Sequence, residues 1–132
     1  MNKLEYIPGD LVKFATNNYT IVNFEENFLH NKICYALILT NSTKTAFVAD
    51  RDILPISLTP EILEKNGWKD DGYDWYRLPT KRAYLYITKD ITTLGEFLVC
   101  VGLDRHNLAS INFVHQLQHL LFGLGLNSEM EV

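Results

Sequence analysis

The chain has 132 residues, of which 47% are hydrophobic and 21% are charged. This composition is that of a folded globular protein, and it excludes a disordered tail, a collagen-like fibre and a coiled coil. A chain of this length buries roughly two-thirds of its unfolded surface, so its stability requires no disulfide or metal. The net charge of −4 argues against a protein that binds nucleic acid through overall positive charge.

The two cysteines, Cys34 and Cys100, lie in apolar segments without the spacing of a zinc site. We expect buried free thiols, with a core disulfide or a reactive thiol as alternatives. The first eight residues lack the apolar stretch of a signal peptide, and no apolar segment is long enough to span a membrane. The sequence therefore predicts a cytoplasmic protein with no membrane partner.

Residues 9–56 contain short segments rich in β-branched and aromatic residues, separated by polar turn formers. The expected strands are 11–14, 20–24, 33–40 and 45–49, with turns at 17–18, 25–27 and 41–42. Apolar residues on both faces of the third segment favour a central strand. Because closure into a small barrel removes free strand edges, we predict an SH3-like β-barrel over residues 1–56.

The second half begins with a short helix, for which Thr59 is the expected N-cap, Pro60 the first residue and Gly67 the stop. Strands are expected at 73–78, 82–88 and 96–101, joined through 89–95. The second of these strands has the clearest two-residue alternation in the chain. A helix over 111–124, capped by Ser110, completes a compact α-β-β-β-α unit over 57–132.

The fold class is therefore α+β, with the unit over 57–132 packed on the barrel as one cooperative structure, because each half alone is small. The helical periodicity of the last segment places one apolar stripe against the core. The stripe contains Phe113, Val114, Leu117, Leu120, Leu121 and Leu124, and the opposite side contains Asn112, His115, Gln116 and His119. Ile111 and Phe122 lie between the two faces, where either a neighbouring strand covers them or they contact a partner. The tail over 127–132 is expected to be frayed.

His115 and His119 have the spacing of two metal ligands on a helix, but Gln116 stands where zinc proteases have glutamate. A third ligand has no obvious source, so we expect two solvent-facing histidines without metal. The sequence has no phosphate-binding glycine loop and no nucleophile motif. It predicts no catalytic residue, metal or cofactor, and a hydrolase that uses His115 is the weakest alternative.

Aromatic residues crowd the stretch 65–82 among basic ones, which is the composition of a stacking platform for single-stranded nucleic acid. We expect the same rings to pack in a core, and a binding surface is the alternative. The aromatic residues are Trp68, Tyr73, Trp75 and Tyr76, and the basic ones are Lys65, Lys69, Arg77, Lys81 and Arg82.

Three segments resemble a known family. Residues 55–68 fit the pattern P-I-x-L-T-x-E-x-L-x-x-x-G-[FW], and FVHQLQHLLF at 113–122 is similar to Y-V-H-Q-L-Q-N-L-Y-F. Gly9–Val12 fits a G-[ND]-x-V opening. Small uncharacterised proteins encoded by phages and prophages of gut bacteria have the same opening, followed by the other two motifs in the same order as here. The resemblance implies a phage or mobile-element product that acts in the host cytoplasm, and His119 stands where that family has Asn.

We expect a non-enzymatic module that binds a protein, either of the host or of the phage. The alternative is a nucleic-acid-binding protein that uses the stretch 65–82. The candidate interaction residues are Trp68, Tyr73, Trp75, Tyr76, Arg77, Arg82, His115, Gln116 and Phe122.

Overall fold

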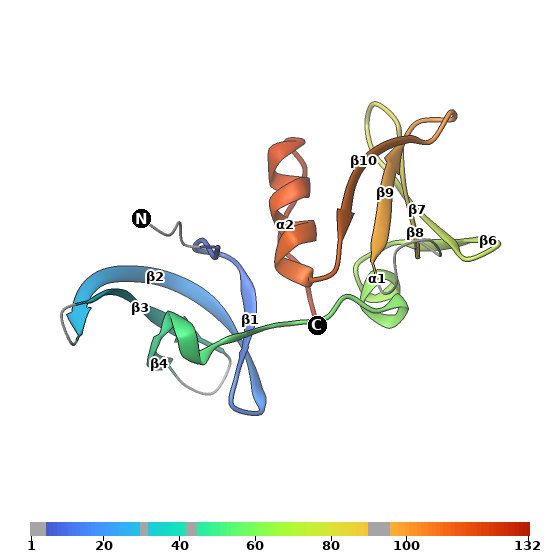
Figure 1. Ribbon diagram of the computed structural model, residues 1–132. Coiled ribbons are helices and arrows are strands. Elements are labelled where there is room, and N and C mark those ends of the chain that lie inside the picture. The colour runs from blue at the N-terminus through green and yellow to red at the C-terminus, as the bar shows by residue number, and fades with distance from the viewer. Residues whose placement is uncertain (1–4, 30–31, 42–44, 90–95) are drawn as a thin grey trace. The chain divides into compact units, whose positions relative to one another are not determined.

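The computed structural model describes residues 5–29, 32–41, 45–89 and 96–132. These residues form a mixed α+β fold that is mostly strand, with two antiparallel five-stranded sheets and few helices (Figure 1). The chain divides into two compact units. Unit 1 comprises Met1–Ile56 with Gln118–Glu129, and unit 2 comprises Ser57–Leu117 with Met130–Val132.

Unit 1 contains the sheet with the order β4-β3-β2-β1-β5. Its elements are β1 (Leu11–Phe14), β2 (Asn17–Leu29), β3 (Lys32–Thr40), β4 (Thr45–Ala49), the 3-10 helix η1 (Asp50–Asp52) and β5 (Leu54–Pro55). The central position predicted for β3 is confirmed, since β3 pairs with both β2 and β4. Within the described residues β4 and β5 are the two edge strands of this sheet, and no pairing between them closes a barrel.

The expected turn at 25–27 is wrong, because these residues continue β2 and pair with residues 34–36 of β3. The expected turn at 17–18 is also displaced, since β2 begins at Asn17 and Ala15 in the preceding turn has a φ of 54°. The side chain of Cys34, and with it the expected two-faced apolar pattern of 33–39, lies outside the described residues.

The core of unit 1 is a cluster of buried apolar side chains from the first strands and the segments that flank them. It contains Tyr6, Val12, Tyr19, Ile21, Val48 and Ile53. Val12 and Tyr19 are directly paired across β1 and β2, so strand alternation directs both to the same face of the sheet. This alternation explains why short segments with polar neighbours form one core.

Unit 2 contains the second sheet, with the order β10-β9-β8-β7-β6. Its elements are α1 (Pro60–Lys65), β6 (Lys69–Gly72), β7 (Trp75–Pro79), β8 (Tyr84–Lys89), β9 (Phe97–Val101) and β10 (His106–Ile111). The prediction for α1 is confirmed, because Thr59 Oγ1 accepts from the Ile62 N–H at 3.2 Å and Gly67 has a φ of 90°. The α-β-β-β-α prediction is wrong in its strand number, since β6 and β10 border the three expected strands.

One face of the second sheet is apolar and buried. Its buried side chains are Leu85, Ile87, Phe97, Val99 and Ile111, and unit 2 also buries Leu58, Leu63, Trp68, Val114 and Leu117. The 90–95 connection lies outside the described residues. Cys100 is a buried free thiol, as expected.

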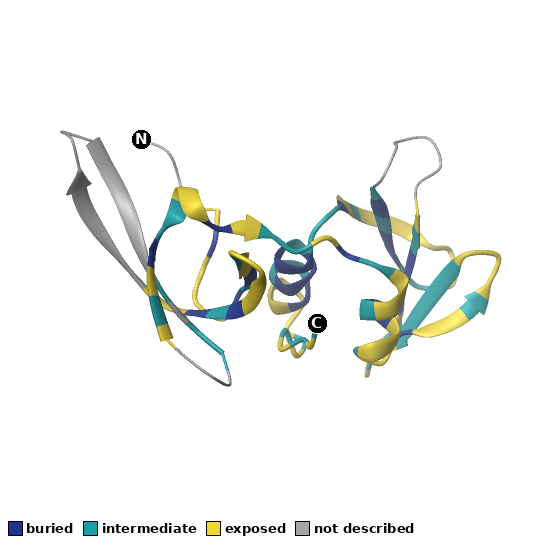
Figure 2. Ribbon diagram, turned by 90° about the horizontal axis from the view of Figure 1, so that it is seen from below, coloured by how far each residue is buried: buried dark blue, intermediate teal, exposed yellow. Residues whose placement is uncertain are grey.

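The second helix, α2 (Val114–Gly123), starts later than predicted, because Ile111 ends β10. Gln116 Oε1 accepts from the N–H groups of Asn112 and Phe113 at 2.7 and 3.1 Å, so Ser110 is not the cap. The predicted outward face of this helix is wrong, because His115 is fully buried. Figure 2 shows that α2 contains both buried and exposed residues. The His115 ring stacks on Phe113, with 5.9 Å between the ring centroids.

The prediction of a frayed tail after α2 is wrong, because hydrogen bonds hold these residues. Within unit 2, Asn66 Nδ2 donates to the Glu131 carbonyl and the Glu131 N–H donates to Asn66 Oδ1, both at 2.7 Å. Within unit 1, Gln118 donates to the Ser128 carbonyl at 3.2 Å. Side-chain amides therefore hold the tail at two places.

Candidate interaction face

The aromatic residues of the stretch 65–82 do not form a single surface. Trp68 is buried in unit 2, whereas Tyr73 is 98% exposed in the β6–β7 turn. Tyr76 lies near Glu64 and Glu61 of α1, and burial, followed by these carboxylates, raises its pKa above the ordinary tyrosine value. Core packing, the expected role, therefore describes Trp68 but not Tyr73, and the four rings do not lie on one platform.

The pairing of β7 with β8 places a different set of aromatic residues on one face of the sheet. In the β7–β8 ladder, Arg77 is paired with Tyr86 and Pro79 with Tyr84, so these residues share a face with Trp75. The Trp75 and Tyr86 rings are nearly perpendicular, with 6.3 Å between their centroids. This is the favourable edge-to-face geometry of an aromatic pair.

Arg105 completes the cluster from the β9–β10 turn. Its guanidinium carbon lies 4.4 Å from the Trp75 ring centroid and 4.8 Å from that of Tyr86. The Arg105 Nη2 atom also lies 3.4 Å from Asp71 Oδ2. Cation–π contacts and an ion pair together therefore orient this guanidinium.

Arg77 is held in a similar way. Its guanidinium carbon lies 5.4 Å from the Tyr84 ring centroid, and its Nε lies 3.6 Å from Asp71 Oδ1. The carboxylate of Asp71 therefore forms ion pairs with both Arg77 and Arg105. We call this set of Asp71, Trp75, Arg77, Tyr84, Tyr86 and Arg105 the aromatic–arginine face.

The backbone at Arg105 is strained. Its φ is 50°, a value that residues other than glycine seldom adopt, and its N–H donates to the Gly102 carbonyl at 3.0 Å. Such strain persists only where surrounding contacts hold the residue. Here the stacked and ion-paired side chain provides those contacts.

The face combines buried and accessible groups. Tyr86 is buried beneath Arg105, whereas Tyr84 is 42% exposed and the side chains of Arg77 and Arg105 are 43% and 41% exposed. Solvent-facing edges of Trp, Tyr and Arg over a fixed base can contact another macromolecule.

Trp75 and Arg77 were among the residues predicted from the sequence. The other four residues of the face were not, namely Asp71, Tyr84, Tyr86 and Arg105. The alternation of the strand predicted at 82–88 placed both tyrosines on one side, so pairing with 73–78 would have been a usable signal. Nothing local marked Arg105, since it reaches the face from a turn.

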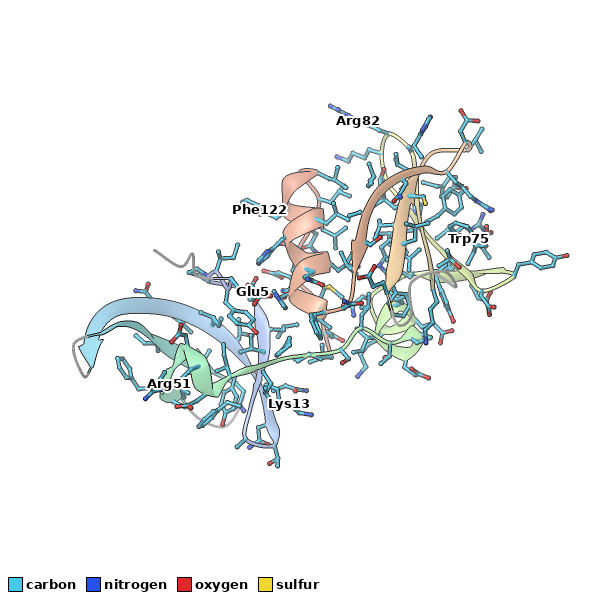
Figure 3. All side chains as sticks on the ribbon, in the orientation of Figure 1. Glu5, Lys13, Arg51, Trp75, Arg82 and Phe122 are labelled. Atoms are coloured by element: carbon cyan, nitrogen blue, oxygen red, sulfur yellow. The ribbon has the colours of Figure 1, made fainter. Side chains whose placement is uncertain are left out.

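The β7–β8 turn carries two of the predicted basic residues, Lys81 and Arg82, and both are exposed. They border a cleft of about 410 Å³ that is lined by residues 79–84, Gly102 and Leu103. Tyr84 belongs both to this cleft and to the aromatic–arginine face. Figure 3 shows Arg82 at the end of the hairpin remote from Trp75.

In unit 1, His119 is bound to a carboxylate and is not a free solvent-facing side chain. Its Nε2 lies 2.9 and 2.8 Å from the two carboxylate oxygens of the buried Asp10. Asp10 Oδ2 also accepts from the Ile7 N–H at 2.9 Å. Burial, with Glu5 and Asp10 nearby, raises the pKa of Tyr6 to about 12.

Gln118 connects the same helix to the start of β1. Its Oε1 accepts from the Leu11 N–H at 2.9 Å, and its Nε2 donates to the Gly9 carbonyl at 3.0 Å. Two of the three segments that carried the family resemblance therefore meet at 9–11 and 118–119. The polar residues of 115–119 thus have roles within the fold. His115 packs on Phe113, Gln116 caps the start of α2, and His119 pairs with Asp10.

The other predicted candidates have separate places. His115 is too deeply buried to meet a substrate, and Gln116 caps the start of α2. Phe122 is 70% exposed near the end of α2 (Figure 3). Among the described residues, no three His, Cys, Asp or Glu side chains are grouped to bind a metal ion.

Comparison of the chain with protein-family models, with curated proteins and with solved structures gives no match. Across the described part of the chain, no helix has the length and apolar character needed to cross a membrane.

Proposed function

We propose that the protein is a non-enzymatic module that binds a protein partner through the aromatic–arginine face of unit 2. The observation that carries the proposal is Arg105, whose guanidinium lies over Trp75 and Tyr86 and is paired with Asp71. Trp, Tyr and Arg are the residues that most often dominate the energy of protein interfaces. Their fixed arrangement reduces the side-chain entropy lost on binding.

We also propose that unit 1 is an SH3-like barrel. The proposal is supported by the antiparallel strands of the sheet, in which β1 lies between β2 and β5, and by the 3-10 helix η1 before β5. SH3-like domains commonly bind proteins, so this supports the same function class by analogy of fold. A phage or mobile-element origin, with action in the host cytoplasm, is a proposal that rests on the sequence resemblance alone.

Arg105 offers a direct test, because it is exposed and its replacement leaves the buried face of the sheet intact. We would immobilise the wild-type chain, Arg105→Ala and Arg105→Lys, capture proteins from a bacterial lysate and measure the purified candidate by calorimetry. Both variants should bind at least tenfold more weakly, since lysine keeps the charge but not the planar stacking.

The matched control is Arg51→Ala, which removes an exposed arginine of unit 1. It should bind as the wild-type chain does. A partner that binds Arg105→Ala and the wild-type chain equally would overturn the proposal.

The second candidate function is single-stranded nucleic-acid binding, which the exposed Lys81 and Arg82 beside Tyr84 favour. Against it, Arg105 covers the ring faces of Trp75 and Tyr86 on which bases would stack. Binding of a labelled oligothymidylate at two salt concentrations tests it, because phosphate-driven affinity falls steeply with salt. No binding at low salt would reject this function.

A further inference from the structure

We propose that the cleft at the β7–β8 turn binds a carboxylate of an acidic, leucine-containing peptide segment; this inference rests on the protein-binding function proposed above. The cleft has a volume of about 410 Å³, which suits one or two side chains. Its walls are residues 79–84 on one side and Gly102 and Leu103 on the other. It adjoins the aromatic–arginine face at Tyr84.

The charge of the cleft is the first argument. Its lining contains Lys81 and Arg82 and no acidic residue. In the part of the chain that the structure describes, Arg77 and Arg105 are paired with Asp71, whereas no ion pair involves Lys81 or Arg82. These two cations are therefore available to an external anion, and an arginine beside a lysine favours a carboxylate by charge-assisted hydrogen bonds.

The rigidity of the cleft is the second argument. Thr80 Oγ1 accepts from the N–H groups of Ala83 and Arg82 at 3.1 and 3.4 Å, and the Thr80 N–H donates to the Ala83 carbonyl at 3.1 Å. On the opposite wall, the Gly102 N–H donates to the Tyr84 carbonyl at 3.0 Å. The backbone on both walls is thus fixed before a ligand arrives, which lowers the entropy lost on binding.

The apolar groups select a peptide over a nucleic acid. Leu103 is 91% exposed beside the two cations, and Pro79 also lines the cleft. An aliphatic side chain next to a carboxylate can cover Leu103, whereas a nucleic acid offers no aliphatic side chain. The Tyr84 ring already carries Arg77 on one face, which reduces its value for base stacking.

The experiment uses the full chain and three probes of equal length. They are a fluorescein-labelled peptide of alternating Glu and Leu, its Gln–Leu counterpart, and an oligothymidylate. We expect the acidic peptide to bind at low salt, to weaken as salt rises, and to shift the backbone amide NMR signals of 80–84, Gly102 and Leu103. The Gln–Leu peptide should bind at least tenfold more weakly.

The double variant Lys81→Ser/Arg82→Ser should lose at least tenfold in affinity for the acidic peptide. Lys13→Ser/Arg51→Ser makes the same change of charge at exposed positions of unit 1 and should bind as the wild-type chain does. Equal binding by the two double variants, or no binding of the acidic peptide, would overturn the inference. Stronger binding of the oligothymidylate with shifts at the same amides would also overturn it, in favour of nucleic acid.

The two proposals fail separately. If Arg105→Ala abolishes capture of the partner while Lys81→Ser/Arg82→Ser has no effect, the protein-binding function stands and the carboxylate cleft does not. If the partner binds Arg105→Ala like the wild-type chain, the function itself is overturned, whatever the peptide does.

Discussion

Gln118→Leu should destabilise unit 1 by about 3 kcal/mol. The substitution keeps a side chain of similar size but removes three hydrogen bonds, to the Leu11 N–H and to the carbonyls of Gly9 and Ser128. Gln118 is buried, so water cannot replace these partners fully. A net loss of about 1 kcal/mol for each bond gives the total, with the unsatisfied Leu11 N–H as the largest part.

The measurement should report on unit 1 specifically. Both tryptophans, Trp68 and Trp75, belong to unit 2, so their fluorescence follows the other unit. We would therefore measure amide hydrogen exchange at Leu11, together with urea unfolding by circular dichroism. The Leu11 amide should lose protection by about 100-fold, and a loss of 3 kcal/mol corresponds to a melting temperature lower by about 10 °C.

Gln116→Leu is the matched control, because it makes the same chemical change two residues away but affects a helix start in unit 2. It should alter unfolding followed by tryptophan fluorescence and leave Leu11 exchange unchanged. A Leu11 amide that stays protected in Gln118→Leu, with a stability loss below about 0.5 kcal/mol, would refute the reasoning.

Four further outcomes are expected. Because the folded-state pKa of Tyr6 is about 12, above its ordinary value of 10.0, stability should fall as pH rises from 10 towards 12; Tyr6→Phe should flatten that fall in alkaline denaturation curves. Phe122→Ser should change stability by less than about 0.5 kcal/mol in urea, since the ring is exposed; a loss of several kcal/mol would make it a core residue. Ile87→Ala should cost about 3 kcal/mol in the same assay, because the residue is fully buried. Cys100 should resist alkylation in the folded protein, because burial raises the pKa of its thiol; rapid labelling of its peptide, detected by mass spectrometry, would contradict this.

Elements with a strong local signal were predicted correctly. Helix α1 follows from Thr59, Pro60 and Gly67, because capping chemistry depends on a few neighbouring residues. Strand β8 follows from its two-residue alternation. In contrast, β6 and β10 consist of KDDG and HNLASI and lie at the two edges of their sheet. Edge strands are half solvated, so they lack the apolar pattern that identifies a strand.

The burial of His115 and Gln118 was not predictable from the periodicity of α2. A single apolar stripe describes a helix that packs against one core. Residues 114–117 of α2 belong to unit 2, whereas 118–123 belong to unit 1. Each unit buries polar as well as apolar side chains of the helix, and two of the three partners of Gln118 lie more than one hundred residues away in the sequence.

The candidate site was predicted in part. Trp75 and Arg77 were identified by composition, and the tyrosines opposite them required the pairing of two strands that the sequence presented separately. Arg105 required the position of a turn 28 residues after Arg77 in the sequence. Composition therefore indicated the kinds of residue at the face, and only the register showed which of them meet.

The assignment of 118–129 to the first unit has a practical consequence for dissecting the protein. The backbone passes from one unit to the other three times, after residues 56, 117 and 129, so neither unit is encoded by an uninterrupted stretch of the gene. A fragment cut at residue 56 would lack the glutamine and histidine that secure the start of its own first strand. Functional mapping should therefore rely on point substitutions in the intact chain, and an isolated first unit would need its helical segment joined back by a designed linker.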